Sequence, residues 1–278
     1  MHGAGNDYIY IDCTSTPAPD SPADLAREMS DRHFGAGGDG IVLILPSECA
    51  NFRMRMFNAD GSEAQMCGNA SRCVGKYVYD NGLTGGRTRV TLETLAGIKI
   101  LDLHPGADGK IATVTVDMGE PVTRCELIPV VGQGCADFVD TPMATSRGPV
   151  AVTAVSMGNP HGVVFTEGEL TDDLVHGLGR EMEVLPDWPE KANIEFARVD
   201  GPADITMRVW ERGSGETLAC GTGACATAVA AVLSGRTGRK VKLHLLGGEL
   251  DIEWRETDNH VMMTGPAATV FTGTYFRH

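Results

Sequence analysis

The alternation of apolar and polar residues along the chain predicts many short strands and few helices. Strands are typically runs of about four to eight residues that alternate apolar and polar side chains, or that are apolar throughout where both faces are buried. We predict strands, in chain order, at residues 8–13, 41–45, 52–57, 90–94, 98–103, 112–117, 150–156, 162–165, 193–199, 204–210, 241–245, 250–254, 261–263 and 269–271. The chain is therefore expected to be rich in sheet.

Helical patterns are fewer. The segment Ser21-Pro22-Ala23-Asp24 has a capping residue, a proline and an acid in the order that begins a helix, which we expect to run to about His33. A second helix is predicted at residues 172–181. Helical spacing predicts a third, with one apolar face made by Ala70, Cys73, Val74, Tyr77 and Val78. Residues 224–233 are apolar nearly all round, which predicts a buried helix that ends at Gly235.

The chain contains an internal repeat. Residues 54–69 and 207–222 share a plan in which an arginine, an aromatic residue, a glutamate and a Cys-Gly pair recur at an offset of 153 positions. Gly5-Asn6 and Gly158-Asn159 keep the same offset. Such self-similarity indicates two copies of one structural unit. Each copy places one cysteine, Cys67 or Cys220, directly before a predicted helix.

The repeat predicts two domains of the α+β class, related by pseudo-symmetry, each with strands around a buried central helix. A length of 278 residues fits about two domains. We expect Met118-Gly119-Glu120-Pro121 to be the crossing into the second domain and Met263-Thr264-Gly265-Pro266, which resembles it, to be the return. The first domain is then residues 1–118 plus 264–278, and the second is 119–263.

Composition excludes several classes of partner. The net charge of −14 and the pI near 4.9 argue against binding to nucleic acid or to an anionic membrane surface. The sequence has no apolar run long enough to cross a bilayer, and its first residues do not resemble a signal peptide. We expect a cytoplasmic protein whose eight cysteines stay reduced.

Cys67 and Cys220 are the candidate catalytic residues. Each lies among glycines at the expected start of a helix, a setting that binds anions and makes a thiol more acidic. Two such thiols facing one another can invert a stereocentre. A thiolate removes the α-proton from one face and a thiol delivers a proton to the other. No cofactor or metal is expected, because the cysteine spacings are not those of zinc sites.

Structural interpretations of the same residues remain open. Unpaired cysteines are usually buried small hydrophobes, and we interpret Cys73 and Cys225 in this way. Asn6 and Asn159 could serve turns, and His161 could be an ordinary core or surface histidine. The matched places of Cys67 and Cys220 in the two copies favour the catalytic interpretation for that pair.

Several segments together resemble the signatures of the diaminopimelate epimerase family, and the resemblance spans the whole chain in order. They are Met1-His2-Gly3-Ala4-Gly5-Asn6-Asp7, Phe57-Asn58-Ala59-Asp60-Gly61-Ser62-Glu63, Met66-Cys67-Gly68-Asn69, Gly158-Asn159-Pro160-His161, Glu211-Arg212-Gly213-Ser214-Gly215-Glu216-Thr217 and Ala219-Cys220-Gly221-Thr222-Gly223. The resemblance implies the diaminopimelate epimerase-like fold, with each domain a strand-rich half-barrel around its helix. It also implies a cofactor-independent epimerase, usually a homodimer, that interconverts LL- and meso-2,6-diaminopimelate for lysine and cell-wall synthesis.

The resemblance also implies roles for single residues. Cys67 and Cys220 would be the acid and base, and His161 and Glu211 would help to set their protonation. Backbone N–H groups of Gly68, Asn69, Gly221 and Thr222 would hold the reacting carboxylate. The rest of the substrate, largely its distal amino and carboxyl groups, would be held by Asn6, Asn58, Asn159, Asn193, Glu211 and Arg212. A carboxylate for an ammonium group and an arginine for a carboxylate make chemical sense.

The chain departs from the family pattern at Ala70-Ser71, which follow Cys67-Gly68-Asn69, and at Gly40, which we leave out of the predicted site. Two other functions stay open. One is a racemase of the same fold that acts on proline, hydroxyproline or histidine. The other is a small-ligand binding protein without catalysis, which would tolerate the loss of either cysteine.

Overall fold

The chain folds into two compact units. The structure is a computed structural model that describes residues 1–131 and 137–277. The first unit contains Met1–Asp117 and Thr264–His278, and the second contains Met118–Met263. Met118 therefore belongs to the second unit, whereas we had expected it at the end of the first domain.

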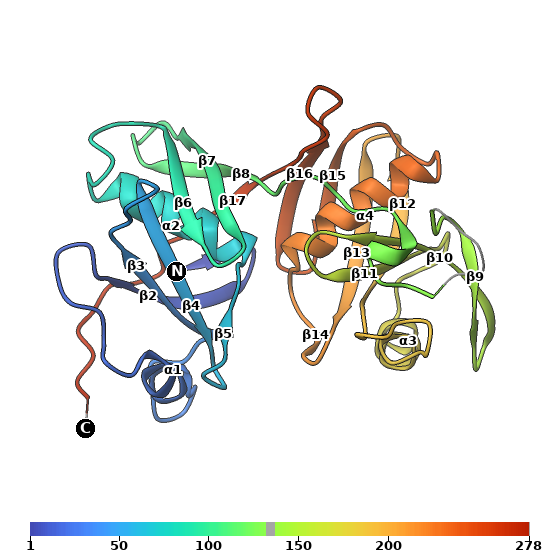
Figure 1. Ribbon diagram of the computed structural model, residues 1–278, viewed down its shortest axis with the longest axis horizontal. Coiled ribbons are helices and arrows are strands. Elements are labelled where there is room, and N and C mark those ends of the chain that lie inside the picture. The colour runs from blue at the N-terminus through green and yellow to red at the C-terminus, as the bar shows by residue number, and fades with distance from the viewer. Residues whose placement is uncertain (132–136, 278) are drawn as a thin grey trace. The chain divides into compact units, whose positions relative to one another are not determined.

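The first unit surrounds one long helix with strands (Figure 1). Its elements are β1 (His2–Gly3), β2 (Asn6–Asp12), α1 (Pro22–Ser30), β3 (Gly40–Leu45), β4 (Phe52–Asn58), β5 (Glu63–Ala64), α2 (Gly68–Asp80), β6 (Arg89–Thr94), β7 (Gly97–Pro105) and β8 (Ile111–Asp117). β2 pairs in parallel with β3, and β3 pairs antiparallel with β4. β4 also pairs in parallel with β6, and β6, β7 and β8 form an antiparallel meander. α2 packs against β1, β2, β7 and β8.

The second unit has the same plan around α4. Its elements are η1 (Cys125–Leu127), β9 (Thr141–Thr145), β10 (Gly148–Ser156), β11 (Pro160–Phe165), η2 (Asp173–Leu178), α3 (Gly179–Glu183), β12 (Asn193–Gly201), β13 (Asp204–Glu211), β14 (Gly215–Glu216), α4 (Gly221–Leu233), β15 (Lys240–Leu245) and β16 (Gly248–Trp254). The last strand, β17 (Val261–Pro266), begins in the second unit and ends in the first, where it pairs with β8. β11 pairs in parallel with β12, β12 antiparallel with β13, and β13 in parallel with β15. α4 contacts β10, β11, β12, β15 and β16.

The same pairings recur in both units at the offset found in the sequence. Tyr8 pairs with Gly40 in the first unit, as His161 pairs with Asn193 in the second. Likewise Phe57 pairs with Glu63, and Trp210 pairs with Glu216. α2 and α4 each have 13 residues, and each ends shortly before a glycine with positive φ, 76° at residue 82 and 70° at residue 235. The local structure therefore repeats together with the motifs.

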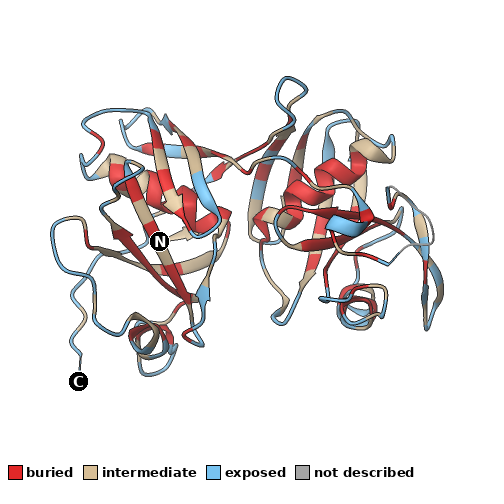
Figure 2. Cartoon of the chain, viewed as in Figure 1, coloured by how far each residue is buried: buried red, intermediate tan, exposed pale blue. Residues whose placement is uncertain are grey.

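The prediction of an α+β fold with a buried helix is confirmed. Nearly every residue of α4 is buried, as its uniformly apolar sequence requires (Figure 2). α2 is more amphipathic, and it buries the first two turns and the apolar face that contains Cys73, Val74 and Val78. Neither helix, and no other helix in residues 1–131 and 137–277, is long and apolar enough to cross a membrane.

Three predicted boundaries are wrong. The first helix ends at Ser30 rather than near His33, because the Asp31 carboxylate accepts hydrogen bonds from the backbone N–H groups of His33 and Phe34 and turns the chain. The helix predicted at 172–181 is a π-helical segment, η2, followed by α3 up to Glu183. Residues 269–271 are not a strand, and only a single bridge between Ala268 and His2 forms nearby.

The state of the cysteines differs from expectation at one position. Within residues 1–131 and 137–277, six cysteines are present as thiols, at positions 13, 49, 67, 73, 220 and 225. Cys125 is disulfide-bonded, so the expectation that every cysteine is reduced is wrong for this residue. Cys135 lies outside the described residues.

A buried hydroxyl group in α4 leads to a prediction about the free energy of unfolding. The Thr227 side chain is fully buried, and its hydroxyl has no hydrogen-bond partner among the described residues. A buried polar group without a partner costs about 1–3 kcal/mol, so Thr227→Val, which keeps the shape, should raise the free energy of unfolding by about 1 kcal/mol. Urea denaturation of both proteins measures this. Thr227→Ser keeps the hydroxyl and should lower the stability; if Thr227→Val is the less stable variant, the hydroxyl has a partner.

Candidate active site

Cys220 lies at the N-terminus of α4, where its side chain caps the helix. The residue has an extended backbone, and its Sγ accepts a hydrogen bond of 3.3 Å from the N–H of Gly223. The Thr222 hydroxyl lies 3.4 Å from the same sulfur. Only 6% of Cys220 is exposed. The sulfur is therefore held by the first turn of the helix, whose N–H groups lack acceptors within the helix.

Two carboxyl groups raise the proton affinity of Cys220. Burial raises the pKa of the Cys220 thiol well above its ordinary value, and the nearby carboxylates of Glu211 and Glu195 raise it further. Hydrogen bonds from Thr222 and Gly223 oppose the effect only in part. The thiol form of Cys220 is thus favoured in the structure, contrary to the simple expectation of an acidified thiol at a helix start.

Glu211, at the end of β13, is a carboxyl group close to this thiol. The Thr217 hydroxyl donates to its Oε1, and the charge of Glu211 raises the pKa of the Cys220 thiol. Burial is the largest cause that raises the pKa of Glu211, and the charge of Glu195 adds to it. Glu211 therefore acts on the charge state of Cys220 within the second unit, and its role in catalysis stays a prediction.

His161 is fully buried and is paired with a residue that the sequence analysis did not select. Its Nδ1 lies 2.7 Å from Oε1 of Glu195, whose side chain is also fully buried. Its Nε2 lies 3.0 Å from Oδ1 of Asn159. The two side chains meet because β11 and β12 run in parallel with His161 opposite Asn193, so Glu195 lies two residues further along the neighbouring strand. A single glutamate inside the apolar run Ile194-Glu195-Phe196 was the available signal for Glu195.

Asn193 and Arg212 join two loops of the second unit. The Asn193 amide donates to the backbone carbonyl of Pro160 at 3.1 Å and accepts from the N–H of Arg212 at 2.9 Å. The Arg212 side chain is exposed and donates to the carbonyl of Glu190 at 2.9 Å. Asn193 is the first residue of β12, and Arg212 directly follows Glu211, the last residue of β13.

Cys67 occupies the matching position in the first unit. It caps α2, and its Sγ accepts from the N–H of Ala70 at 3.5 Å. The Cys67 thiol donates to Oδ1 of Asn6 at 3.4 Å. The Asn6 amide donates in turn to Oδ2 of Asp39 at 2.7 Å, which fixes its orientation. Asp39 was not selected from the sequence; burial and the charge of Asp7 raise its pKa.

The remaining predicted residues of the first unit lie close to these helix and strand ends. The Asn58 side chain accepts from the Tyr8 hydroxyl and donates to Ser62, both at 3.1 Å. Asn69 is buried in the first turn of α2 and accepts from Arg72 at 2.8 Å. Gly68 in α2, and Gly221 and Thr222 in α4, stand in first turns whose N–H groups point beyond the helix.

The predicted residues thus form two groups, one in each unit. Cys67 and Asn6 are directly bonded, with Asn58, Gly68 and Asn69 on neighbouring element ends. In the second unit the Cys220 thiol is bonded to Thr222 and feels the charge of Glu211, and His161 is bonded to Asn159. Each group combines a thiol, polar amides and the start of a helix, which can bind an anionic ligand and exchange a proton.

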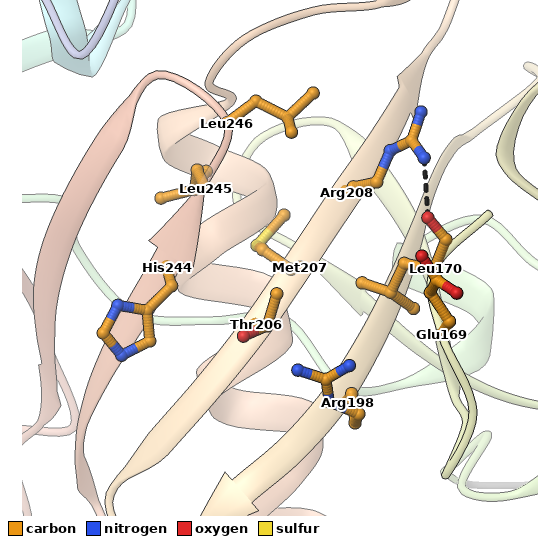
Figure 3. Close-up of a pocket in the computed structure, with 9 residues that line it drawn as sticks. All are labelled: Glu169, Leu170, Arg198, Thr206, Met207, Arg208, His244, Leu245 and Leu246. Carbon is orange, nitrogen blue, oxygen red and sulfur yellow. Dashed lines mark hydrogen bonds between the residues drawn. The ribbon is translucent and has the colours of Figure 1, made fainter. Parts of the chain in front are cut away.

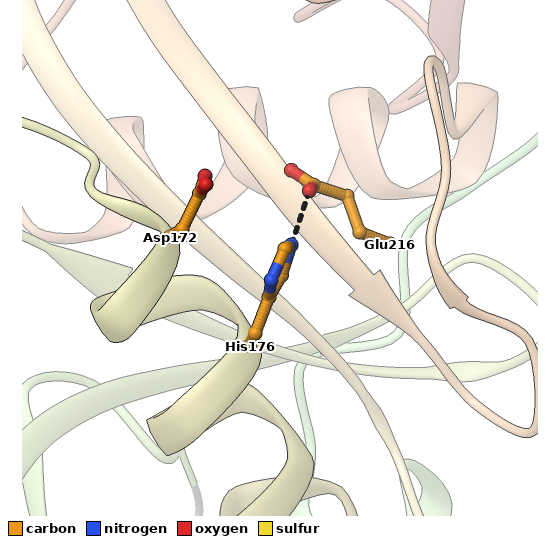
Figure 4. Close-up of side chains that lie close together, drawn as sticks. All are labelled: Asp172, His176 and Glu216. Atoms are coloured by element: carbon orange, nitrogen blue, oxygen red, sulfur yellow. Dashed lines mark hydrogen bonds and ion pairs between the residues drawn. The ribbon is translucent and has the colours of Figure 1, made fainter.

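The second unit also has a cluster of potential metal ligands near its surface. Asp172, His176 and Glu216 bring ligand atoms within 4.8 Å of one another, and the His176 ring is directed at the Glu216 carboxylate (Figure 4). However, Arg208 donates to both oxygens of Glu216, at 2.6 and 2.8 Å, and to Asp172 at 2.7 Å. Because a guanidinium group already neutralises these carboxylates, we interpret the cluster as an ion-pair network.

A hollow of about 300 Å³ on the sheet of the second unit is a second alternative site (Figure 3). It is lined by Glu169, Leu170, Arg198, Thr206, Met207, Arg208, His244, Leu245 and Leu246. None of these residues belongs to the predicted site, and Arg208 inside it is bonded to the carbonyl of Leu170 at 2.6 Å. The hollow therefore adds no catalytic group to those described above.

Comparison with known proteins decides the family. The family model described as diaminopimelate epimerase matches residues 1–124 and 153–270. The chain belongs to the diaminopimelate epimerase family. Diaminopimelate epimerases of Desulfovibrio desulfuricans and Methanococcus maripaludis are 54% and 52% identical to it. The alignments cover 99% and 98% of this chain, and 96% and 97% of the relatives.

Membership of the diaminopimelate epimerase family makes the chain an enzyme of the isomerase class and confirms the resemblance seen in the sequence. Among solved structures, a probable proline racemase from Agrobacterium radiobacter matches with a TM-score of 0.65 at 17% identity. The match covers 95% of this chain and 88% of that protein. At this identity the likeness shows a shared fold and nothing about the substrate.

The environment of Cys220 predicts slow alkylation of this thiol. Because its pKa is raised, little thiolate is present at pH 8, and the rate of its reaction with iodoacetamide should still increase above pH 9. Replacing Glu211 by glutamine removes one neighbouring negative charge and should speed the reaction at pH 8 about 10-fold, the change that one pKa unit gives.

Peptide mass spectrometry follows each site separately, and the exposed Cys49 is the internal reference for reagent and pH. Equal rates for Cys220 in the two proteins would mean that Glu211 does not control this thiol.

Proposed function

We propose that this member of the family interconverts LL- and meso-2,6-diaminopimelate without a cofactor, by proton transfer between substrate and the thiols of Cys67 and Cys220. The observation that carries the proposal is the matched pair of thiols, each capping a buried helix and each bonded to polar side chains that the motifs had selected. The relatives named as diaminopimelate epimerases support the choice of substrate.

The reaction needs one thiolate and one thiol. The thiolate takes the α-proton, the electron pair of the broken C–H bond remains on the substrate, and the opposite thiol delivers a proton to the other face of the carbon. After one turnover the two sulfurs have exchanged protonation states, so the reverse reaction uses them in the opposite roles. The mechanism requires that Cys67 and Cys220 approach opposite faces of the α-carbon.

The starts of α2 and α4 can hold the reacting carboxylate. Negative charge develops on this group as the proton leaves, and N–H groups of Gly68, Asn69, Gly221 and Thr222 are placed in first helical turns. Such donors stabilise developing charge because they are oriented before the reaction. We assign the amides of Asn6, Asn58, Asn159 and Asn193, the Glu211 carboxylate and the Arg212 guanidinium to the rest of the substrate, largely its distal amino and carboxyl groups.

His161 and Glu211 support proton transfer rather than perform it. The charge of Glu211 raises the pKa of the Cys220 thiol and so sets how readily this thiol gives up its proton. His161 is tied to Glu195 in the same unit and adds to the charge balance that Glu211 experiences.

Hydrogen exchange tests the proposal directly. Purified protein in D₂O, with LL-diaminopimelate and no added cofactor, should replace the α-proton signal by deuterium while meso product forms, as proton NMR follows. Cys67→Ser and Cys220→Ser should each lower kcat at least about 1,000-fold, since each removes an acid/base group. Circular dichroism checks that both variants fold, and Cys49→Ser, an exposed thiol outside the site, is the matched control.

If the α-proton exchanges on proline, hydroxyproline or histidine instead, the protein is a racemase of that amino acid, which is the alternative function. Near wild-type turnover in either cysteine variant would refute the two-thiol mechanism. Absence of exchange on every amino acid, in folded and reduced protein, would leave the binding-protein hypothesis.

We also propose that the enzyme works as a homodimer in the cytoplasm. The resemblance to the family supports both points, and the exposed apolar side chains of Val270, Phe271 and Phe276 support an association of two copies. Light scattering of the purified protein should give twice the chain mass of 29.5 kDa, and cell fractionation should recover the protein with cytoplasmic markers. A single-chain mass at micromolar concentration would contradict the dimer.

A further inference from the structure

A line of hydrogen bonds in the second unit leads from the core to a half-buried amide. Glu195 on β12 and His161 on β11 have fully buried side chains joined at 2.7 Å. Asn159, just before β11, is half-buried and lies 3.0 Å from the other nitrogen of the ring. The order Glu195, His161, Asn159 therefore connects a buried charge to a side chain that a ligand can reach.

The two oxygens that face the His161 ring suit a ring with a positive charge. Each ring nitrogen faces an oxygen, Oε1 of Glu195 for Nδ1 and Oδ1 of Asn159 for Nε2. A carboxylate oxygen and an amide oxygen only accept, so both nitrogens donate, and a ring that donates twice is an imidazolium. A fully buried cation needs an anionic partner, which Glu195 supplies.

The surroundings of Glu195 support its negative charge. A side chain at Gly223 would place its Cβ 2.6 Å from Oε1 of Glu195, so this oxygen lies against the first turn of α4, where the helix favours anions. Its other oxygen, Oε2, has no hydrogen-bond partner among the described residues. The carboxylate thus depends on His161 and on the helix for its stability. Glu211 and Cys220 are the other titratable groups that face this pair.

We propose that Glu195 is a positioning residue for substrate binding. It keeps His161 as an imidazolium, and the imidazolium holds Oδ1 of Asn159, so that Nδ2 of Asn159 is left to donate to a carboxylate of the substrate. This inference rests on the proposed function. No hydrogen bond from Nδ2 of Asn159 to another described residue is found, which agrees with a donor kept for a ligand.

Loss of the charge on His161 would turn the side-chain amide of Asn159 around, so that its nitrogen rather than its oxygen faces the ring. A neutral ring whose Nε2 carries a lone pair accepts a hydrogen bond, so Asn159 would turn and donate Nδ2 to the ring. Its Oδ1 would then face the substrate carboxylate, and two acceptors repel one another. Glu195 should therefore affect the binding of substrate, although it is buried and does not touch it.

The variant Glu195→Gln keeps the size of the side chain and removes its charge. We expect KM for LL-diaminopimelate to rise about 10- to 100-fold at pH 7.5, the loss expected for a hydrogen bond to a charged group. The change in kcat should be smaller, at most about 10-fold, because Glu195 also raises the pKa of the Cys220 thiol. The increase of KM with pH should also begin at lower pH than in the wild type, because the imidazolium has lost its anion.

Glu183→Gln is the matched control. Glu183 is another buried carboxylate of this unit, and it accepts from Trp210 and from the N–H of Gly213, both at 2.9 Å. Its loss should lower the free energy of unfolding and leave the pH at which KM rises unchanged. A shift equal to that of Glu195→Gln would show a general effect of lost charge and overturn the proposal.

A second measurement needs no turnover. In protein with ¹⁵N-labelled histidine, the His161 signals, assigned by their loss in His161→Gln, should show both nitrogens protonated at pH 7.5 in the wild type. In Glu195→Gln one nitrogen should be unprotonated. A wild-type His161 with an unprotonated nitrogen overturns the proposal, and this spectrum decides even if Glu195→Gln fails to fold.

The two hypotheses fail in different ways. If the wild type does not epimerise diaminopimelate, the proposed function is wrong, and the NMR spectrum still reports the charge of His161. If the wild type epimerises and Glu195→Gln lowers kcat with unchanged KM, Glu195 acts through Cys220 and the positioning role is wrong.

Discussion

The structure of each unit depends on a sulfur atom that caps a helix. Cys67 and Cys220 accept hydrogen bonds from the first turns of α2 and α4, and the helices that they cap are largely buried in their units. A cap on a buried helix cannot be relaxed by water, so the position of each sulfur is set by the packing of the whole unit. The precision that proton transfer needs is therefore obtained from the core.

The two units share a backbone plan and differ in charge. Positions that carry His161, Glu195 and Glu211 in the second unit are matched in the first by Tyr8, Val42 and Asn58. Cys220 consequently lies among buried ionisable groups, and Cys67 is bonded to the neutral amide of Asn6. A duplicated scaffold can thus offer two thiols in similar geometry with different proton affinities, which suits a reaction in which one gives and the other takes.

Much of this organisation could be predicted from local sequence. The 13-residue helices, their capping cysteines and most strands follow from periodicity and from the repeat, because neighbouring residues determine them. The importance of Glu195 and Asp39 could not be predicted, since each depends on a partner far along the chain, His161 and Asn6. The strand predicted at 269–271 failed because β-prone residues form a strand only where a neighbouring edge accepts them.

The path of the chain has a consequence for synthesis on the ribosome. The second unit is inserted between Asp117 and Thr264, and the final segment returns to the first unit, where Thr264 bonds to Thr115 and Ala268 pairs with His2. The carbonyl of Pro266 also accepts from the buried side chain of Arg72. Translation proceeds from the N-terminus, and domains usually fold as they emerge. Here the unit that emerges first must wait for the last residues, so the second unit is able to complete its fold before the first.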